Sequence, residues 1–79
     1  MPKIFEQDGF TFFFYMNEHL PVHVHVMRQG KKAKLEIVGG KAVAVIPGRL
    51  SASDLKKAER IASENSALIA DRWRETFDK

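Results

Sequence analysis

The sequence predicts a single α+β domain in which a four-stranded antiparallel sheet precedes a helical segment. Three observations predict this fold. The 79 residues suit one domain, the first part of the chain alternates apolar and polar residues as strands do, and the last part repeats apolar residues at helical spacing. We expect one domain over residues 1–79, strands within about residues 3–46 and a helical segment at about 52–77.

The strand signals fall in four segments, FTFFFYMN, VHVHVM, KKAKLEIV and KAVAVI. Aromatic and β-branched residues, which favour strands, dominate the first two. The EHLP segment between them predicts a hairpin loop of three or four residues, in which Pro21 restricts Leu20 to an extended conformation. Gln29-Gly30 and Gly39-Gly40 suit two-residue turns that need positive φ angles. We therefore expect three consecutive hairpins.

These turns also predict the strand register. On one face the register pairs Val22 with Ile37, Val24 with Leu35, Val26 with Ala33, Ile37 with Ala42, Leu35 with Ala44 and Ala33 with Ile46. On the opposite face His23 lies across from Glu36 and His25 across from Lys34, and Val43 and Val45 share this face. Because apolar residues reach the second face as well, we expect something to cover part of it.

Helical signals begin after residue 50. Ser51 and Asp54 resemble a capping box at the start of a helix. An apolar stripe suited to packing on the valine face follows, made of Leu55, Ala58, Ala62, Ile69, Trp73 and Thr76. The SENS segment, residues 63–66, predicts either a kink in one helix or a break between two. DNA binding by a helix-turn-helix is disfavoured, because the helices lack a third partner and the turn lacks glycine.

Composition limits the chemistry and the partners. The chain has no cysteine, which excludes disulfides and thiolate chemistry and leaves histidine and carboxylate as metal ligands. No stretch approaches the roughly 20 apolar residues of a membrane helix, and the first ten residues lack signal-peptide features. We therefore expect a cytoplasmic protein that does not bind membranes. The net charge of +3 is compatible with an acidic protein or a nucleic acid as partner and selects neither.

All three histidines, His19, His23 and His25, lie within seven positions. Strand residues two apart share a face at about 6 to 7 Å, so His23 and His25 can converge on one ligand while His19 approaches from the loop. A divalent metal held by the three histidines, with Glu18 or Glu36 adding a carboxylate, is one interpretation. The sequence itself requires no cofactor.

Other interpretations of the histidines stay open. In a metal-free site, His23 or His25 would act as general acid or base beside Tyr15 and Lys34. Alternatively, the histidines only pack against aromatic residues and bond to the backbone. A third interpretation is a surface for a partner protein or nucleic acid, made of Tyr15, Glu18, His19, His23, His25, Lys32 and Lys34.

Two further segments have binding interpretations. Phe12, Phe13, Phe14 and Tyr15 could stack bases as RNA-binding sheets do. We favour core packing together with a homodimer interface for these aromatic residues. The positive charges of Lys56, Lys57 and Arg60 would carry DNA binding if the protein were an autoregulator.

Four segments of the chain carry a family resemblance: YMNEHLPVHVHV, KKAKLEI, VIPGRLSASDL and a terminal helix ending near DRW. Together they resemble a family of small bacterial proteins, domain of unknown function 4160. The family's recurrent motif is matched by Asn17, Glu18, His19, Pro21, His23 and His25. Val22 stands where a second proline is common, Ile61 where a tryptophan often lies, and Asn65 where the helix often carries another histidine. The last departure weakens any mechanism that needs a fourth imidazole.

The resemblance implies a protein partner, since family members are often described as encoded beside another small protein in arrangements similar to toxin-antitoxin modules. We therefore expect a small bacterial interaction protein of toxin-antitoxin type, forming a homo-oligomer and binding a partner protein and nucleic acid. The alternative is an enzyme, a histidine-dependent nuclease or metal-dependent hydrolase that uses His19, His23 and His25.

Overall fold

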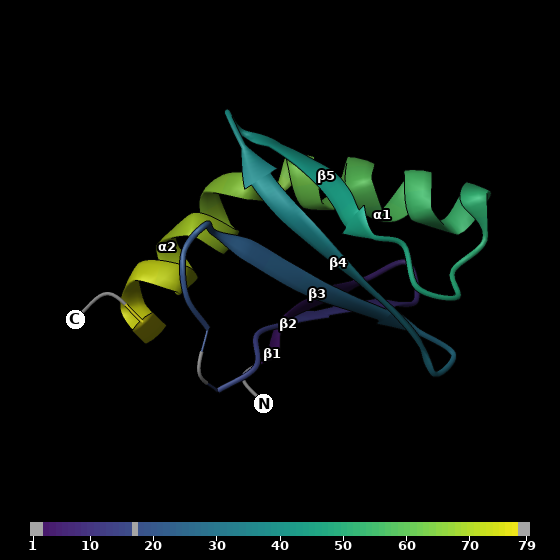
Figure 1. Ribbon diagram of the computed structural model, residues 1–79, viewed down its shortest axis with the longest axis horizontal. Helices are drawn as coiled ribbons and strands as arrows, with labels where there is room; N and C mark the ends of the chain where they lie inside the picture. Colours follow the sequence, from purple (N-terminus) through teal and green to yellow (C-terminus); the bar gives the residue numbers. More distant parts are fainter. Residues whose placement is uncertain (1–2, 17, 78–79) are drawn as a thin grey trace.

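The chain forms a five-stranded antiparallel sheet followed by two helices (Figure 1). The computed structural model describes residues 3–16 and 18–77. The elements are β1 (Lys3–Gln7), β2 (Phe10–Phe13), β3 (His23–Arg28), β4 (Lys31–Val38), β5 (Lys41–Ile46), α1 (Ala52–Glu64) and α2 (Ser66–Phe77). Neighbouring strands are hydrogen-bonded in chain order. The predicted α+β class, the antiparallel sheet and the C-terminal helices are confirmed.

The predicted number of strands is wrong, because β1 precedes the four expected strands and pairs with β2. The turn between them holds Asp8 at φ 55° and Gly9 at φ 82°. Positive φ at both central residues is what a tight hairpin turn requires, and Asp-Gly is a strong sequence signal for it. The sequence prediction overlooked this dipeptide.

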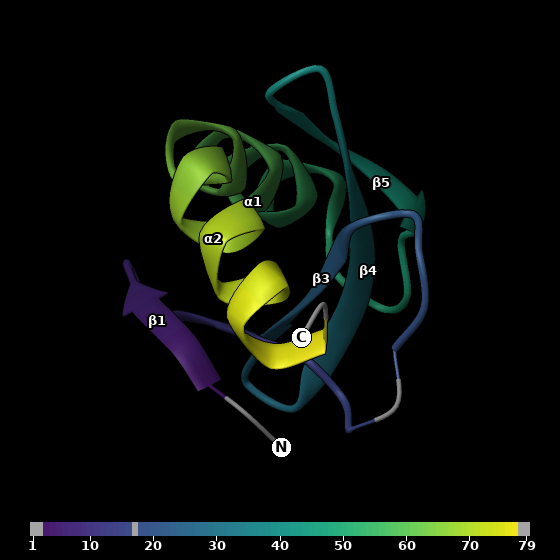
Figure 2. The same ribbon diagram turned by 90° about the vertical axis from the view of Figure 1, so that its left-hand side faces the viewer.

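The connection between β2 and β3 is longer than the predicted hairpin loop. The first predicted strand extended to Asn17, which lies outside the described residues, but β2 ends at Phe13 and β3 begins only at His23. Phe14 leaves the sheet to bury its ring against Trp73, at a centroid distance of 5.4 Å. β2 therefore ends at Phe13, and the connection to β3, described at residues 14–16 and 18–22, forms a loop at the edge of the sheet (Figure 2).

The predicted register of β3 and β4 is confirmed, including His23 opposite Glu36 and His25 opposite Lys34. The predicted pairing of β4 with β5 is confirmed for Leu35 opposite Ala44, but the predicted pairing of Ala33 with Ile46 is wrong. A register shift between Lys34 and Leu35 places Ile46 opposite Lys34 instead of Ala33. Such a bulge adds a residue to one strand and bends it.

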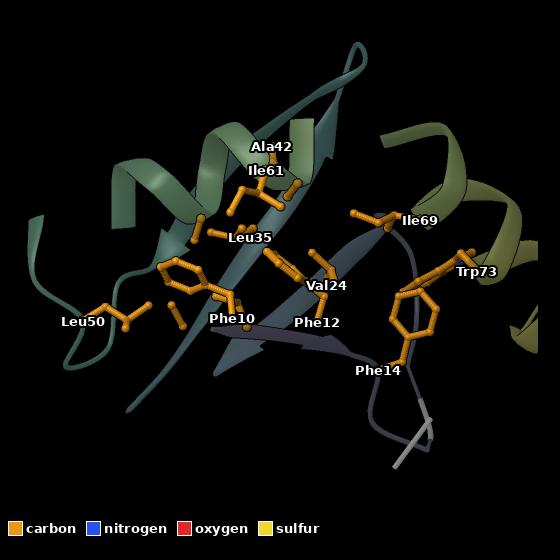
Figure 3. Close-up of a cluster of buried hydrophobic side chains, with 14 residues drawn as sticks. Phe10, Phe12, Phe14, Val24, Leu35, Ala42, Leu50, Ile61, Ile69 and Trp73 are labelled. Carbon is orange, nitrogen blue, oxygen red and sulfur yellow. The ribbon is translucent and has the colours of Figure 1, made fainter. Parts of the chain in front are cut away.

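Both helices lie on the same side of the twisted sheet and bury its valine face (Figures 2 and 3). The core contains Ala58, Ala62, Ile69 and Trp73 of the predicted helical stripe. The fully or nearly fully buried residues of the whole core are Phe10, Phe12, Phe14, Val24, Val26, Ala33, Leu35, Ala42, Leu50, Ala58, Ile61, Ala62, Ile69 and Trp73. Thr76 was predicted in the stripe and is exposed, whereas Phe77 packs against the core. Within α2 the face toward the core continues from Ile69 through Trp73 to Phe77 in four-residue steps, so Thr76 lies beside this face.

Asn65 divides the helical segment into two helices. Its backbone N–H donates to the carbonyl oxygens of Ile61 and Ala62, and its side-chain Nδ2 donates to Ile61 O at 2.8 Å. These bonds satisfy carbonyl groups at the end of α1. At the other end, Ser51 Oγ accepts from Asp54 N at 3.1 Å, which confirms the predicted N-cap.

Side chains of α1 bind backbone donors of β5, the strand at one end of the sheet. Ser63 Oγ accepts from Ala42 N and Glu59 Oε2 accepts from Ala44 N, both at 2.8 Å. Occupied donors oppose pairing with a further strand, which protects this edge from aggregation.

The outer face of β4 and β5 carries exposed apolar residues. Val43, 49% exposed, and Val45, 43% exposed, were predicted on this face, whereas Ile46, 55% exposed, was predicted on the core face and reaches the outer face through the register shift. Neither described helix is long and apolar enough to cross a membrane.

Gly48 is the glycine that the packing of the fold requires. It has φ +61°, and a Cβ at this position would collide with the backbone carbonyl oxygen of Lys32 on β4. Gly30 also has positive φ, at +77°, but a Cβ there would meet open space. We expect Gly30→Ala to lower the free energy of unfolding by about 1 kcal/mol through its φ angle alone. Gly48→Ala should lower the free energy of unfolding by about 1 to 3 kcal/mol more than Gly30→Ala does, because its Cβ collides with the Lys32 carbonyl oxygen.

Urea denaturation of the two variants measures this difference. Equal losses of stability in Gly48→Ala and Gly30→Ala would contradict the close approach of the chain after β5 to β4.

Candidate metal centre

Glu18, His23 and His25 bring one carboxylate and two imidazoles together. Glu18 Oε2 lies 2.9 Å from His23 Nε2 and 3.0 Å from His25 Nε2. The potential ligand atoms of the three residues all lie within 4.8 Å of one another. The side chains are only 11%, 6% and 14% exposed, respectively. The three residues therefore form a compact, largely buried polar cluster, which we call the His-Glu centre.

Two different elements supply the centre. Alternation along β3 places His23 and His25 on the face opposite the valines, with their ring centroids 5.4 Å apart. Glu18 comes from the loop of residues 14–22 and also accepts the backbone N–H of Tyr15, at 3.4 Å. The fold of this loop, and not the sheet alone, completes the centre.

Aromatic rings fix the orientation of both imidazoles. Phe13 stacks on His25 at a centroid distance of 5.6 Å, and Tyr15 meets the same ring edge-on at 4.3 Å. Trp73 of α2 lies 5.0 Å from His23. Because rings packed on both sides have few rotamers, the nitrogen atoms are held in place without a ligand.

A backbone carbonyl determines which nitrogen of His23 faces Glu18. The Pro21 carbonyl oxygen lies 2.8 Å from His23 Nδ1, and since a carbonyl only accepts, Nδ1 carries a proton. In the neutral ring Nε2 is then bare and directs its lone pair at the Glu18 carboxylate, 2.9 Å away. Two lone pairs at this distance require a proton or a metal ion between them. A carbonyl that holds the far nitrogen of a histidine is a common arrangement behind metal ligands.

The charges in the centre shift two pKa values downward. Burial opposes ionisation of Glu18, but hydrogen bonding to His23 and the charges of His23 and His25 outweigh it, so the pKa of the carboxyl falls below its ordinary 4.5. Burial lowers the pKa of His25 below its ordinary 6.5, and the charges of His23 and Lys34 act in the same direction against the attraction of Glu18. The fold therefore favours ionised Glu18 and neutral His25.

The other residues that the sequence predicted for the site differ in whether they contact the centre. Tyr15 contacts His25, and Lys34 stands opposite His25 in the sheet, whereas Lys32 is exposed farther along β4. His19 is exposed and is not part of the His-Glu centre among the described residues. Glu36 lies opposite His23 in the strand register, but among the described residues it is not part of the His-Glu centre. Glu18, one of two carboxylates named from the sequence, thus takes the place given to His19.

The aromatic run is divided between the two faces. Phe12, Phe13 and Phe14 are at most 1% exposed, and Tyr15 is 39% exposed. Core packing, which we favoured from the sequence, therefore accounts for the three phenylalanines. Base stacking by them would require the core to open.

A pocket of about 430 Å³ adjoins the His-Glu centre. It lies between the loop and α2, and its lining residues are Glu18, His19, Leu20, Val22, Ala70, Trp73, Arg74 and Phe77. Glu18 belongs to both the centre and the pocket, and Trp73 contacts His23 on one side and lines the pocket. A ligand in this pocket would therefore lie beside the cluster.

The lowered pKa of Glu18 predicts a pH-dependent contribution to stability. Ionised Glu18 stabilises the fold above its ordinary pKa of 4.5, and this contribution is lost as the pH falls through the lowered folded value. We expect Glu18→Gln to reduce the free energy of unfolding by about 1 to 3 kcal/mol near neutral pH in the presence of a chelator. The deficit should shrink progressively below pH 4.5.

Glu36→Gln is the matched control, because Glu36 faces His23 in the register without belonging to the centre. Denaturation of both variants and the wild type across this pH range makes the comparison. A deficit of Glu18→Gln that is the same in acid and at neutral pH would contradict the ion-pair geometry.

Comparison with known proteins gives a family and no function. A family model described as Domain of unknown function (DUF4160) matches residues 9–74, which include the whole His-Glu centre. No curated protein and no solved structure matches the chain. The family suggested by the histidine motif is thereby confirmed: the chain belongs to the family described as Domain of unknown function (DUF4160).

Proposed function

We propose that the protein binds one divalent metal ion through Glu18, His23 and His25 and uses it to hydrolyse a small substrate. The observation that carries this proposal is the convergence of two imidazoles on one carboxylate oxygen: His23 Nε2 lies 2.9 Å from Glu18 Oε2, and His23 Nδ1 is held by Pro21 O. A metal ion satisfies both atoms at once, and His25 Nε2 lies 3.0 Å from the same carboxylate oxygen.

The ligand spacing suits zinc. With bonds of about 2.0 to 2.2 Å, the ligand atoms of a tetrahedral zinc site would lie about 3.3 to 3.6 Å apart. The two distances from Glu18 Oε2 to the imidazoles are 2.9 and 3.0 Å, and all three ligand atoms lie within 4.8 Å of one another, so a bound ion would require the carboxylate to move slightly away from the imidazoles. Two histidines and one glutamate are also a ligand set found in catalytic zinc sites, where the fourth position holds water.

With Glu18, His23 and His25 as ligands, a divalent ion would keep one coordination position open for water and would supply activation of that water for hydrolysis. The adjoining pocket supplies room for the substrate, and the tightly packed rings of Phe13 and Trp73 keep the ligands in position.

We expect the purified protein to bind close to one equivalent of zinc. Native mass spectrometry and inductively coupled plasma analysis after exposure to zinc and desalting measure the stoichiometry. His23→Gln, His25→Gln and Glu18→Gln should each lower zinc affinity by about tenfold or more. His19→Gln is the matched control and should bind like the wild type, because His19 lies outside the centre. Parallel incubations with iron(II), nickel and manganese identify the preferred ion.

Zinc binding that is weak in the wild type, or unchanged in all three ligand variants, would contradict the proposal. The cluster would then be a structural ion pair in which a proton takes the position between His23 and Glu18.

A second candidate function is the binding of another protein in a toxin-antitoxin-like module, the function expected from the family resemblance. The observation that favours it is the apolar outer face of β4 and β5, where Val43, Val45 and Ile46 are between 43% and 55% exposed. Exposed apolar patches of this kind are typical of interaction surfaces. The nearby Lys32 and Lys34 are compatible with an acidic protein or with nucleic acid.

If this face forms the expected homodimer, Val43→Asp should shift the native mass toward the monomer, because it introduces a charge into the buried contact. Leu20→Asp is the control, since Leu20 is 75% exposed but lies in the loop and not on this face. Light scattering at micromolar concentrations measures both. Identical masses of wild type and Val43→Asp would exclude the face as the dimer contact.

A further inference from the structure

We infer that the pocket beside the His-Glu centre binds a small organic anion that carries a flat apolar ring, and that this is the substrate class of the proposed hydrolase. The inference rests on the proposed function for its catalytic meaning. The binding itself is argued from the walls of the pocket, its charges and its distance from the centre.

The walls of the pocket are mainly apolar and aromatic. Trp73 and Phe77 contribute two aromatic rings 4.7 Å apart, and Leu20, Val22 and Ala70 contribute aliphatic surface. A volume of about 430 Å³ lies within the usual range for pockets that bind small molecules. An aromatic ring is the group that such walls bind most favourably, through burial and through ring-ring contact.

Arg74 gives the pocket a contact for an anion, and the proposed metal ion would offset the negative charge of Glu18, which lines the same pocket. Arg74 lines the pocket from α2, and His19 lines it from the loop. Asp71 pairs with Arg74, but both side chains are about 60% exposed, so this ion pair is readily exchanged for a ligand. A guanidinium binds carboxylate and phosphate groups through two parallel hydrogen bonds. The pocket therefore combines an anion contact with an aromatic wall.

The arrangement also places the ligand next to the centre. Glu18 is shared between the centre and the pocket lining, and Trp73 contacts His23 at 5.0 Å while its side chain lines the pocket. A ring in the pocket with its anionic group at Arg74 thus lies beside the metal ligands, because Glu18 lines the same pocket. Aromatic carboxylates that carry a second, hydrolysable group such as an ester match these requirements.

Arg72 allows a matched test of the anion contact. Arg72 and Arg74 lie on the same helix, both are more than half exposed, and both pair with an acidic residue three positions away. Only Arg74 is among the residues that line the pocket. Replacement of either arginine by glutamine changes the charge of the protein equally, so a difference between the variants reports on the pocket.

The experiment is a binding titration of the zinc-treated protein, followed by Trp73 fluorescence and by calorimetry. The probes are phenyl phosphate and benzoate, with benzyl alcohol supplying the ring without the charge and inorganic phosphate the charge without the ring. We expect one of the two aromatic anions to bind at least about tenfold more tightly than either control compound. Arg74→Gln should remove this preference, and Arg72→Gln should retain it.

Ala70→Leu supplies a second variant, which should weaken binding by filling the pocket while preserving the helix. Equal binding of all four probes, or equal effects of Arg72→Gln and Arg74→Gln, would overturn the inference. The zinc content of each sample separates the two proposals. One equivalent of zinc without probe binding overturns the pocket assignment alone, whereas Arg74-dependent probe binding without zinc supports the pocket and overturns the metal centre.

Discussion

The contact of one Glu18 carboxylate oxygen with the Nε2 atoms of His23 and His25 is the interaction on which the site depends. It joins a loop to a strand, since Glu18 belongs to residues 14–22 and both histidines belong to β3. It also places three potential metal ligands in a region where their side chains are at most 14% exposed. Buried ionisable groups are costly unless each has a partner, so the carboxylate and the imidazoles stabilise one another and hold the loop against the sheet.

Packing in the core and around the histidine rings also positions Glu18, His23 and His25. Phe14 turns inward to Trp73 of α2, and β2 ends at Phe13, just before this contact. Pro21 then supplies the carbonyl oxygen that holds His23 Nδ1, while Phe13 and Tyr15 enclose the His25 ring. The pocket lies between the same loop and α2. The loop therefore contributes residues to the His-Glu centre and to the pocket, and α2 contributes residues to the core and to the pocket.

The sequence predicted the parts of this structure that depend on local pattern. Alternation in VHVHVM and the two glycine turns predicted the β3 and β4 register, including both histidine pairings. Helical spacing placed Trp73 in the core. The parts that it missed depend on tertiary contacts. Phe14 leaves the sheet because of Trp73, and Glu18 rather than His19 meets the histidines because the loop folds back, which spacing alone does not determine. The β1 hairpin is different, since its Asp8-Gly9 signal was present in the sequence.

Imidazole nitrogen resonances test the central claim most directly. Long-range proton-nitrogen spectra of the histidine-labelled protein, recorded without metal and with one equivalent of zinc, report which nitrogen of each ring carries a proton and which binds the ion. The geometry predicts that His23 keeps its Nδ1 proton in both states because of Pro21 O, and that zinc shifts the Nε2 resonances of His23 and His25 together. Nε2 resonances that do not respond to zinc, or a His23 ring that lacks the Nδ1 proton, would contradict the His-Glu centre as a metal site.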